Sequence, residues 1–185
     1  MVKPMGIHNI KLLLTDVDGI LNDGKTYAGV KEEYVRFDIQ DGIGQKLAEY
    51  GGLLVGWISG RNSKPVAARA KKLKVPILYQ GKLDKLTIAR QVCRKYGYSL
   101  SQVAYMGDDL IDLPLLIQAG WSATVPNGRP EVKRAVDYVT HARGGDGAFR
   151  EVVEKILKSQ GVWMRTIHLF HQANNHAPSN HSLFG

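Results

Sequence analysis

Two aspartates directly follow the first apolar run of the chain. Residues 10–15 read IKLLLT, and Asp16 and Asp18 come next with a single residue between them. In a strand, residues i and i+2 lie on one face, so the two carboxylates crowd together and each raises the cost of ionising the other. A bound cation, or a reaction that needs both carboxylates, would resolve this conflict. The pair therefore marks a candidate reaction centre.

Other polar side chains follow later apolar runs. In an open α/β sheet, ligands bind beyond the carboxyl ends of the strands, so the residues just after each run are the informative ones. Hydroxyl, guanidinium, ammonium and carboxylate groups all occur at these positions. The residues are Ser59, Gly60, Arg61, Asp84, Lys85, Gly107, Asp108, Asp109 and Asp112.

The apolar runs alternate with amphipathic stretches along the chain. We predict strands at residues 10–15, 53–59, 76–79, 103–107, 121–125 and 138–140, with helices after most of them. This alternation indicates an α/β fold, a Rossmann-like three-layer, doubly wound parallel sheet with helices on both faces. The last helix has an apolar stripe from Ala148 to Leu157, and Asp146 is placed to cap its start.

Two segments depart from this alternation. Residues 25–39 alternate with a period near two and carry Gly29, which predicts a β-hairpin that projects from the sheet. Beyond Gly161 the pattern decays, and residues 162–185 are polar and rich in histidine. We therefore expect one domain over residues 1–161 and a flexible C-terminal tail over 162–185.

Composition limits the possible partners and the compartment. The formal net charge of +8 favours an anionic partner but does not separate nucleic acid from a small phosphate or carboxylate. Cys93 is the one cysteine and lies in a helical pattern. Because a disulfide needs two cysteines, none can form within the chain, which fits a cytoplasmic location. No stretch approaches a signal core or a membrane span, so we expect no membrane partner.

In their order along the chain, these residues resemble the four motifs of the haloacid dehalogenase superfamily of phosphotransferases. The resemblance covers about residues 10–160 and implies that Asp16 is the nucleophile, forming an aspartyl-phosphate. Asp18 would protonate the leaving alkoxide and then take a proton from the attacking water. Ser59 and Lys85 would donate to the phosphoryl oxygens.

The same resemblance implies a Mg²⁺ cofactor. The implied ligands are a carboxylate oxygen of Asp16, the backbone carbonyl of Asp18 and a carboxylate of Asp108. Asp109 and Asp112 would either lie behind these ligands or compete to be ligands themselves.

The superfamily usually selects substrates with an inserted cap domain, and this chain leaves no room for a cap. The phrases DVDGILNDG, RFDIQDGIG, ISGRNS, YQGKLDK, MGDDLIDLP and RGGDGAFRE are similar to the 3-deoxy-D-manno-octulosonate 8-phosphate phosphatase family. That family consists of capless homotetramers in lipopolysaccharide sugar synthesis. The resemblance implies hydrolysis of this sugar-acid phosphate, with subunits closing each other's sites.

The substrate carries a carboxylate as well as a phosphate, and a guanidinium suits either group. Arg61 is the main candidate to bind it, together with Gly60, and Arg143 beside two glycines is a second. The phosphatases of nine-carbon ulosonic acid 9-phosphates are similar throughout the core. There the position of Arg61 tends to differ, so Arg61 favours the eight-carbon substrate.

A noncatalytic oligomerisation module and a nucleic-acid-binding protein are the two alternative classes of function. Some relatives lack phosphatase activity or serve as oligomerisation modules fused to cytidylyltransferases, but such a member should have lost Asp16, Asp18 or Lys85, and all three are present. A nucleic-acid partner would rest on net charge alone, without an aromatic-rich basic motif. We therefore expect a small-molecule phosphatase with no nucleic-acid partner.

Overall fold

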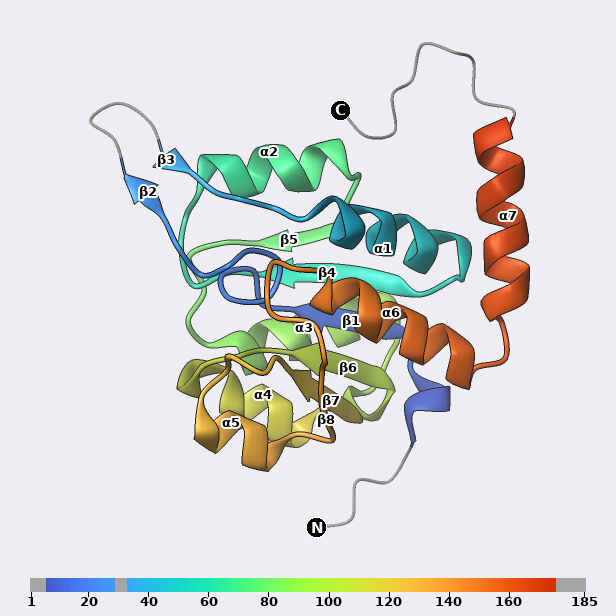
Figure 1. Cartoon of the computed structure of the whole chain (residues 1–185). Helices are drawn as coiled ribbons and strands as arrows, with labels where there is room; N and C mark the ends of the chain where they lie inside the picture. The colour runs from blue at the N-terminus through green and yellow to red at the C-terminus, as the bar shows by residue number, and fades with distance from the viewer. Residues whose placement is uncertain (1–5, 29–32, 176–185) are drawn as a thin grey trace.

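A six-stranded parallel sheet forms the centre of the computed structural model, which describes residues 6–28 and 33–175 (Figure 1). Each strand coincides with one of the predicted apolar runs. The strand order is β5-β4-β1-β6-β7-β8. The strands are β1 Leu12–Thr15, β4 Leu54–Ile58, β5 Ile77–Tyr79, β6 Val103–Met106, β7 Trp121–Thr124 and β8 Tyr138–Val139.

Helices cover both faces of the sheet, which confirms the predicted three-layer α/β fold. On one face lie α1 Ile39–Tyr50, α2 Lys64–Lys72 and α6 Ala148–Ser159. On the other lie α3 Lys85–Tyr96, α4 Leu113–Gln118 and α5 Pro130–Ala135. Because both faces are covered, β1 is apolar along its buried length: Leu13 belongs to the first core, and Leu12 and Leu14 to the second. Short 3₁₀ turns occur at Ile7–Asn9, Leu100–Gln102 and Leu110–Asp112.

The central strand β1 marks the point where the strand order reverses. It pairs with β4 on one side and with β6 on the other, so Thr15 lies between Trp57 and Met106. From β4 the chain continues outward to β5, and from β6 it continues outward in the opposite direction to β7 and β8. Doubly wound sheets bind ligands at such a reversal, beyond the carboxyl ends of the strands. The residues after β1, β4 and β6 are therefore brought to one edge.

A short β-hairpin projects from the sheet beside α2, as predicted (Figure 1). Its strands are β2 Tyr27–Ala28 and β3 Glu33–Tyr34, and Tyr27 lies opposite Tyr34. The paired part is shorter than the predicted 25–39. Phe37 belongs to the body of the molecule, because it bridges to Asn22 and stacks on Trp57 with ring centroids 6.5 Å apart. In the described residues, only this hairpin and α1 lie between β1 and β4.

The start of α6 is capped differently from the prediction. Gly147 occupies the N-cap position, and Asp146 instead pairs with Arg36. The carboxylate of Asp41, on α1, accepts the amide hydrogen of Arg150 at 3.0 Å and lies against the first amides of α6. The prediction for Asp146 was wrong because a cap from another helix leaves no local sequence signal.

The segment after Gly161 differs from the expected flexible tail. Residues Trp163–Asn175 form a helix, α7, which lies against α1 and α6 (Figure 1). Phe170 meets the ring of Tyr50 edge-on at 6.0 Å, and the Thr166 side chain is buried. Trp163, Ile167 and Phe170 follow the i, i+4, i+7 spacing of an amphipathic helix, a signal that the emphasis on the polar, histidine-rich composition of the segment overlooked. The surface that this stripe meets is provided by α1. Residues 176–185 lie outside the described part, and the domain boundary at 161 stays a prediction.

Within the described ranges, no helix is long and apolar enough to cross a membrane.

Candidate active site

Asp16 and Lys85 form the buried ion pair at the centre of the candidate site. Asp16 directly follows β1, and its backbone N–H donates to Met106 O at 2.8 Å, which ties the loop to β6. Lys85 is the first residue of α3, after the N-cap Asp84. Its Nζ lies 2.8 Å from Asp16 Oδ1 and 2.8 Å from Asp112 Oδ1. The ammonium therefore sits between two carboxylates.

The carboxylate of Asp112 is saturated with hydrogen bonds. Its Oδ1 accepts from Lys85 and from the hydroxyl of Tyr105, the latter at 2.6 Å. Its Oδ2 accepts the backbone N–H groups of Asp108 and Asp109, each at 3.1 Å. With both oxygens engaged and the side chain fully buried, Asp112 is suited to orient Lys85 and the 107–109 loop. It lies behind the reacting groups.

Asp108 has a different environment, one that fits a metal ion. Its buried Oδ1 has no hydrogen-bond partner, which is costly for a carboxylate oxygen. Asp16, Asp108 and Asp112 each offer a carboxylate oxygen within 4.8 Å of the others. Mg²⁺ prefers such oxygen ligands, and since Asp112 is already saturated, Asp16 and Asp108 are the residues that would hold it.

Asp109 lies apart from this cluster. Its side chain accepts from the N–H of Leu110 at 2.7 Å, is largely exposed and lies 3.9 Å from the Nε of Arg129. The structure thus brings together Asp16, Asp108 and Lys85 but does not bring the predicted ligand Asp109 to them. Its carboxylate caps the turn that leads into α4.

Burial and the nearby charge of Asp112 raise the pKa of the two candidate metal ligands, Asp16 and Asp108. Burial raises the pKa of Asp16 to about 7, against the opposing effect of Lys85. Burial, together with the charge of Asp112, raises the pKa of Asp108 to about 7. Burial alone would lower the pKa of Lys85, but its two carboxylate neighbours raise it above the ordinary value. The site therefore has more negative charge than Lys85 neutralises, and a divalent cation would complete it.

Asp18 lies beside this cluster and is oriented by polar side chains. Asn22 Nδ2 donates to its Oδ1 at 2.9 Å, and Ser59 Oγ donates to its Oδ2 at 3.3 Å. Asn22 also accepts through Oδ1 from the N–H groups of Gly19 and Gly24, so it fixes the whole turn after Asp18. Sequence reasoning missed this role of Asn22, although an Asn two residues before a glycine is typical of a side-chain-stabilised turn.

Gly19 is required by the close approach of two loops. Its φ is +92°, and a Cβ atom there would lie 2.1 Å from Asp108 Oδ2. Any other residue would thus displace the candidate metal ligand as well as strain the backbone.

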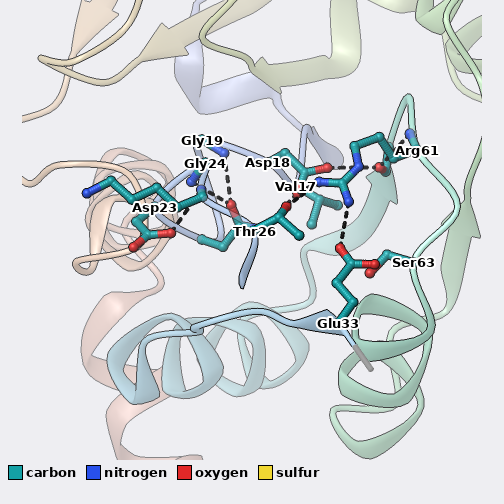
Figure 2. A network of polar contacts seen from close by, with 12 residues as sticks. Val17, Asp18, Gly19, Asp23, Gly24, Thr26, Glu33, Arg61 and Ser63 are labelled. Atoms are coloured by element: carbon teal, nitrogen blue, oxygen red, sulfur yellow. Dashed lines mark hydrogen bonds and ion pairs between the residues drawn. The ribbon is translucent and has the colours of Figure 1, made fainter. Parts of the chain in front are cut away.

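The two arginines proposed to bind substrate differ in their surroundings. The backbone N–H of Arg61 donates to Ser59 Oγ, and its guanidinium lies 3.8 Å from Asp18 and 2.6 Å from Glu33 (Figure 2). Arg143 is exposed in the loop before α6. That loop packs on the loop after β1, since Gly145 N–H donates to Ile20 O at 2.9 Å. Arg61 is at the site, and Arg143 is on a neighbouring loop.

Known proteins are similar to this chain in sequence and in fold. Residues 63–151 match the model of the haloacid dehalogenase-like hydrolase family. The 3-deoxy-D-manno-octulosonate 8-phosphate phosphatase of Salmonella typhi is 42% identical over 83% of this chain and 82% of its own. The Haemophilus influenzae enzyme of the same name is 38% identical over 84% of this chain and 87% of its own. The chain belongs to the 3-deoxy-D-manno-octulosonate 8-phosphate phosphatase family.

A solved member of this phosphatase family has the same fold. The Moraxella catarrhalis phosphatase, in complex with magnesium ion, phosphate ion and a KDO molecule, superposes with a TM-score of 0.85. It is 41% identical, and the alignment covers 89% of this chain and 95% of that one. Family membership confirms the resemblance inferred from the motifs, and the magnesium in this relative agrees with the fit of Asp16 and Asp108 to that ion.

The raised pKa values predict a pH-dependent response of thermal stability to Mg²⁺. Since the folded pKa of about 7 exceeds the usual 3.8, the metal-free protein loses stability as pH rises from about 4 through 7. Saturating Mg²⁺ should raise Tm by about 5 °C or more at pH 8, and much less at pH 5.5, where protons compete for the same oxygens. Differential scanning fluorimetry with and without Mg²⁺ measures this. In Asp108→Asn the increase should disappear, and an equal increase at both pH values would contradict the assignment.

Proposed function

We propose that the protein is a Mg²⁺-dependent phosphatase that hydrolyses 3-deoxy-D-manno-octulosonate 8-phosphate to the free sugar acid and phosphate. The observation that carries this proposal is the buried Asp16–Lys85 pair, at 2.8 Å, beside the unpartnered oxygen of Asp108. The relatives in this family are named for the same activity. Bound Mg²⁺, held by Asp16 and Asp108, would neutralise charge on the phosphoryl group.

The first step forms a covalent intermediate on Asp16. A carboxylate oxygen of Asp16 attacks phosphorus in line, and the bond from phosphorus to the sugar oxygen breaks. The carboxylate is held in orientation by Lys85 and by the N–H of Val17, which donates to Oδ1 at 2.7 Å. Asp18 gives a proton to the departing alkoxide, so the sugar leaves as an alcohol.

The second step releases phosphate. Asp18 now takes a proton from a water molecule that attacks phosphorus, and the bond between Asp16 and phosphorus breaks. Asn22 orients Asp18 for both transfers. We assign Ser59 and Lys85 as donors to the phosphoryl oxygens, so the single hydroxyl hydrogen of Ser59, which is directed to Asp18 before substrate binds, would turn to the phosphoryl group. Such preorganised donors usually provide a large share of the rate enhancement.

Arg61 favours the eight-carbon substrate over a nine-carbon ulosonic acid 9-phosphate. Its guanidinium lies 3.8 Å from Asp18, and we assign it to the carboxylate of the sugar acid. Gly60 and Arg143 complete the set of residues that we assign to substrate binding. A noncatalytic oligomerisation module is disfavoured, because Asp16, Asp18 and Lys85 are present and in contact with one another or with other site residues.

Assembly and location belong to the same proposal. Tyr27 and Tyr34 of the hairpin are 58% and 61% exposed, which supports burial of the hairpin against another subunit in a homotetramer. Val35, which follows Tyr34, is half-buried. We expect Val30 to add apolar surface as well, but it lies outside the described residues. We assign the enzyme to the cytoplasm and to lipopolysaccharide sugar synthesis, with no nucleic-acid or membrane partner.

The activity is tested with a panel of phosphate esters. The wild-type protein should release phosphate from the eight-carbon ulosonate 8-phosphate with a higher kcat/KM than from the nine-carbon ester, other sugar phosphates or nucleotides. The release should require Mg²⁺. Asp16→Asn should lower kcat at least about 10³-fold because an amide cannot form the acyl-phosphate. Near-wild-type turnover by a correctly folded Asp16→Asn protein would refute the mechanism.

The role of Arg61 is tested by comparing two substrates. Arg61→Ala should lower kcat/KM on the eight-carbon ulosonate phosphate by about 10- to 100-fold, the range for one charged hydrogen-bonding contact. On p-nitrophenyl phosphate, which lacks the carboxylate, the loss should be smaller. Equal losses on both substrates would assign Arg61 to the phosphoryl group instead.

The assembly is tested by light scattering coupled to gel filtration. The wild-type protein should elute as a tetramer. A double variant, Tyr27→Ser with Tyr34→Ser, should shift the population toward smaller species because the hairpin loses its exposed apolar area. A fully active wild-type monomer at assay concentration would contradict the proposal.

A further inference from the structure

The hairpin already occupies the guanidinium of Arg61. One terminal nitrogen, Nη2, donates to Glu33 Oε1 at 2.6 Å, and the other, Nη1, donates to Thr26 Oγ1 at 2.7 Å (Figure 2). Nη1 also lies 3.8 Å from Asp18 Oδ1. The arginine that the proposed function assigns to the carboxylate of the substrate therefore binds a carboxylate of its own chain.

Two carboxylates cannot use the same edge of this guanidinium. Arginine binds a carboxylate most strongly through two parallel N–H groups. Here Nη1 and Nη2, which form that edge, bind two different residues: Thr26, just before β2, and Glu33, on β3. A sugar acid that takes this edge in the bidentate manner must displace Glu33.

The contact is weak enough to be displaced. The side chain of Arg61 is 46% exposed and that of Glu33 is 27% exposed, and ion pairs between partly exposed side chains add little net stability. Glu33 lies on β3, whose two residues pair only with those of β2 in the described part of the chain. Movement of Glu33 therefore leaves the pairing of the six-stranded sheet intact.

Charge favours exchange over simultaneous binding. Glu33 and Asp18 approach Arg61 from two sides, so one positive charge already faces two carboxylates. A third carboxylate would be repelled by both unless one moved away. Asp18 is held by two side chains, Asn22 and Ser59, whereas among the described residues only Arg61 pairs with the side chain of Glu33. Glu33 is thus the group that can leave.

We propose that Glu33 is an internal competitor of the substrate carboxylate for Arg61, and that it leaves the guanidinium when the sugar acid binds. This inference rests on the proposed function and adds a residue that determines specificity. Glu33 raises the KM of substrates that carry a carboxylate near Arg61. It has little effect on esters that lack one.

Steady-state kinetics of Glu33→Gln in the full-length, Mg²⁺-saturated enzyme test this. Removing the competitor should lower KM for the eight-carbon ulosonate phosphate by roughly two- to fivefold, and KM for p-nitrophenyl phosphate by less. A rise in KM for the sugar acid would mean that Glu33 positions Arg61, and no change would mean that the contact is irrelevant to binding. Either result overturns the proposal.

Two further variants separate competition from a general charge effect. In an Arg61→Ala background, Glu33→Gln should no longer lower KM for the sugar acid, since the group it competes for is gone. Glu49→Gln is the matched control: it removes the same charge from a carboxylate that pairs with Lys46 on α1, near the opposite edge of the sheet. If Glu33→Gln acts equally in both backgrounds, or if Glu49→Gln gives the same shift, the inference is refuted.

The wild-type enzyme distinguishes failure of this inference from failure of the proposed function. If it does not hydrolyse the eight-carbon ulosonate phosphate, the proposed function is wrong and the inference is overturned with it. If it does so and Glu33→Gln leaves KM unchanged, only the inference is wrong.

Discussion

The hydrogen bonds to the buried carboxylate of Asp112 are the interaction on which the rest of the site depends. They connect α3 through Lys85, β6 through Tyr105 and the loop after β6 through the amides of Asp108 and Asp109. Because the carboxylate is fully buried, loss of any of these donors would leave part of its charge uncompensated, which is strongly unfavourable. The position of Lys85, and hence the orientation of Asp16, follows from this set of bonds.

The same set of bonds leaves the site with an excess of negative charge. Asp112 and Asp16 share Lys85, and no protein donor contacts the buried Oδ1 of Asp108 in the described residues. The raised pKa values of Asp16 and Asp108 express this excess. A fold that only had to be stable would avoid such crowding, because crowded buried carboxylates lower the free energy of unfolding. Here it prepares the site for a divalent cation, and Gly19 allows the loops to approach closely enough for it.

The sequence predicted the location of those site residues that directly follow a strand. Asp16, Ser59 and Asp108 each follow an apolar run, and in a parallel sheet those ends share one edge, so their convergence could be predicted. Features that depend on contacts between distant segments could not. The cap that Asp41 provides for α6 and the partners of Asp112 each join residues whose local patterns are unremarkable. The helical spacing of apolar residues in α7 was present in the sequence, but the surface on α1 that receives them was not. Asp109 and Asp112 could not be distinguished for the same reason: their neighbours across the fold decide which carboxylate is buried.

The residues assigned to catalysis and the residues assigned to substrate selection lie on parts of the fold that differ in rigidity. The groups to which we assign attack on phosphorus and stabilisation of its charge lie at the ends of buried strands and at the start of α3. The groups that we assign to the sugar acid lie where the loop after β4 meets a two-residue ladder. The partly exposed side chain of Glu33 can leave Arg61 at little cost, whereas the Asp16–Lys85 pair cannot separate without exposing buried charge. The position of Arg61, between Asp18 and Glu33, therefore couples a rigid reaction centre to an adjustable binding surface.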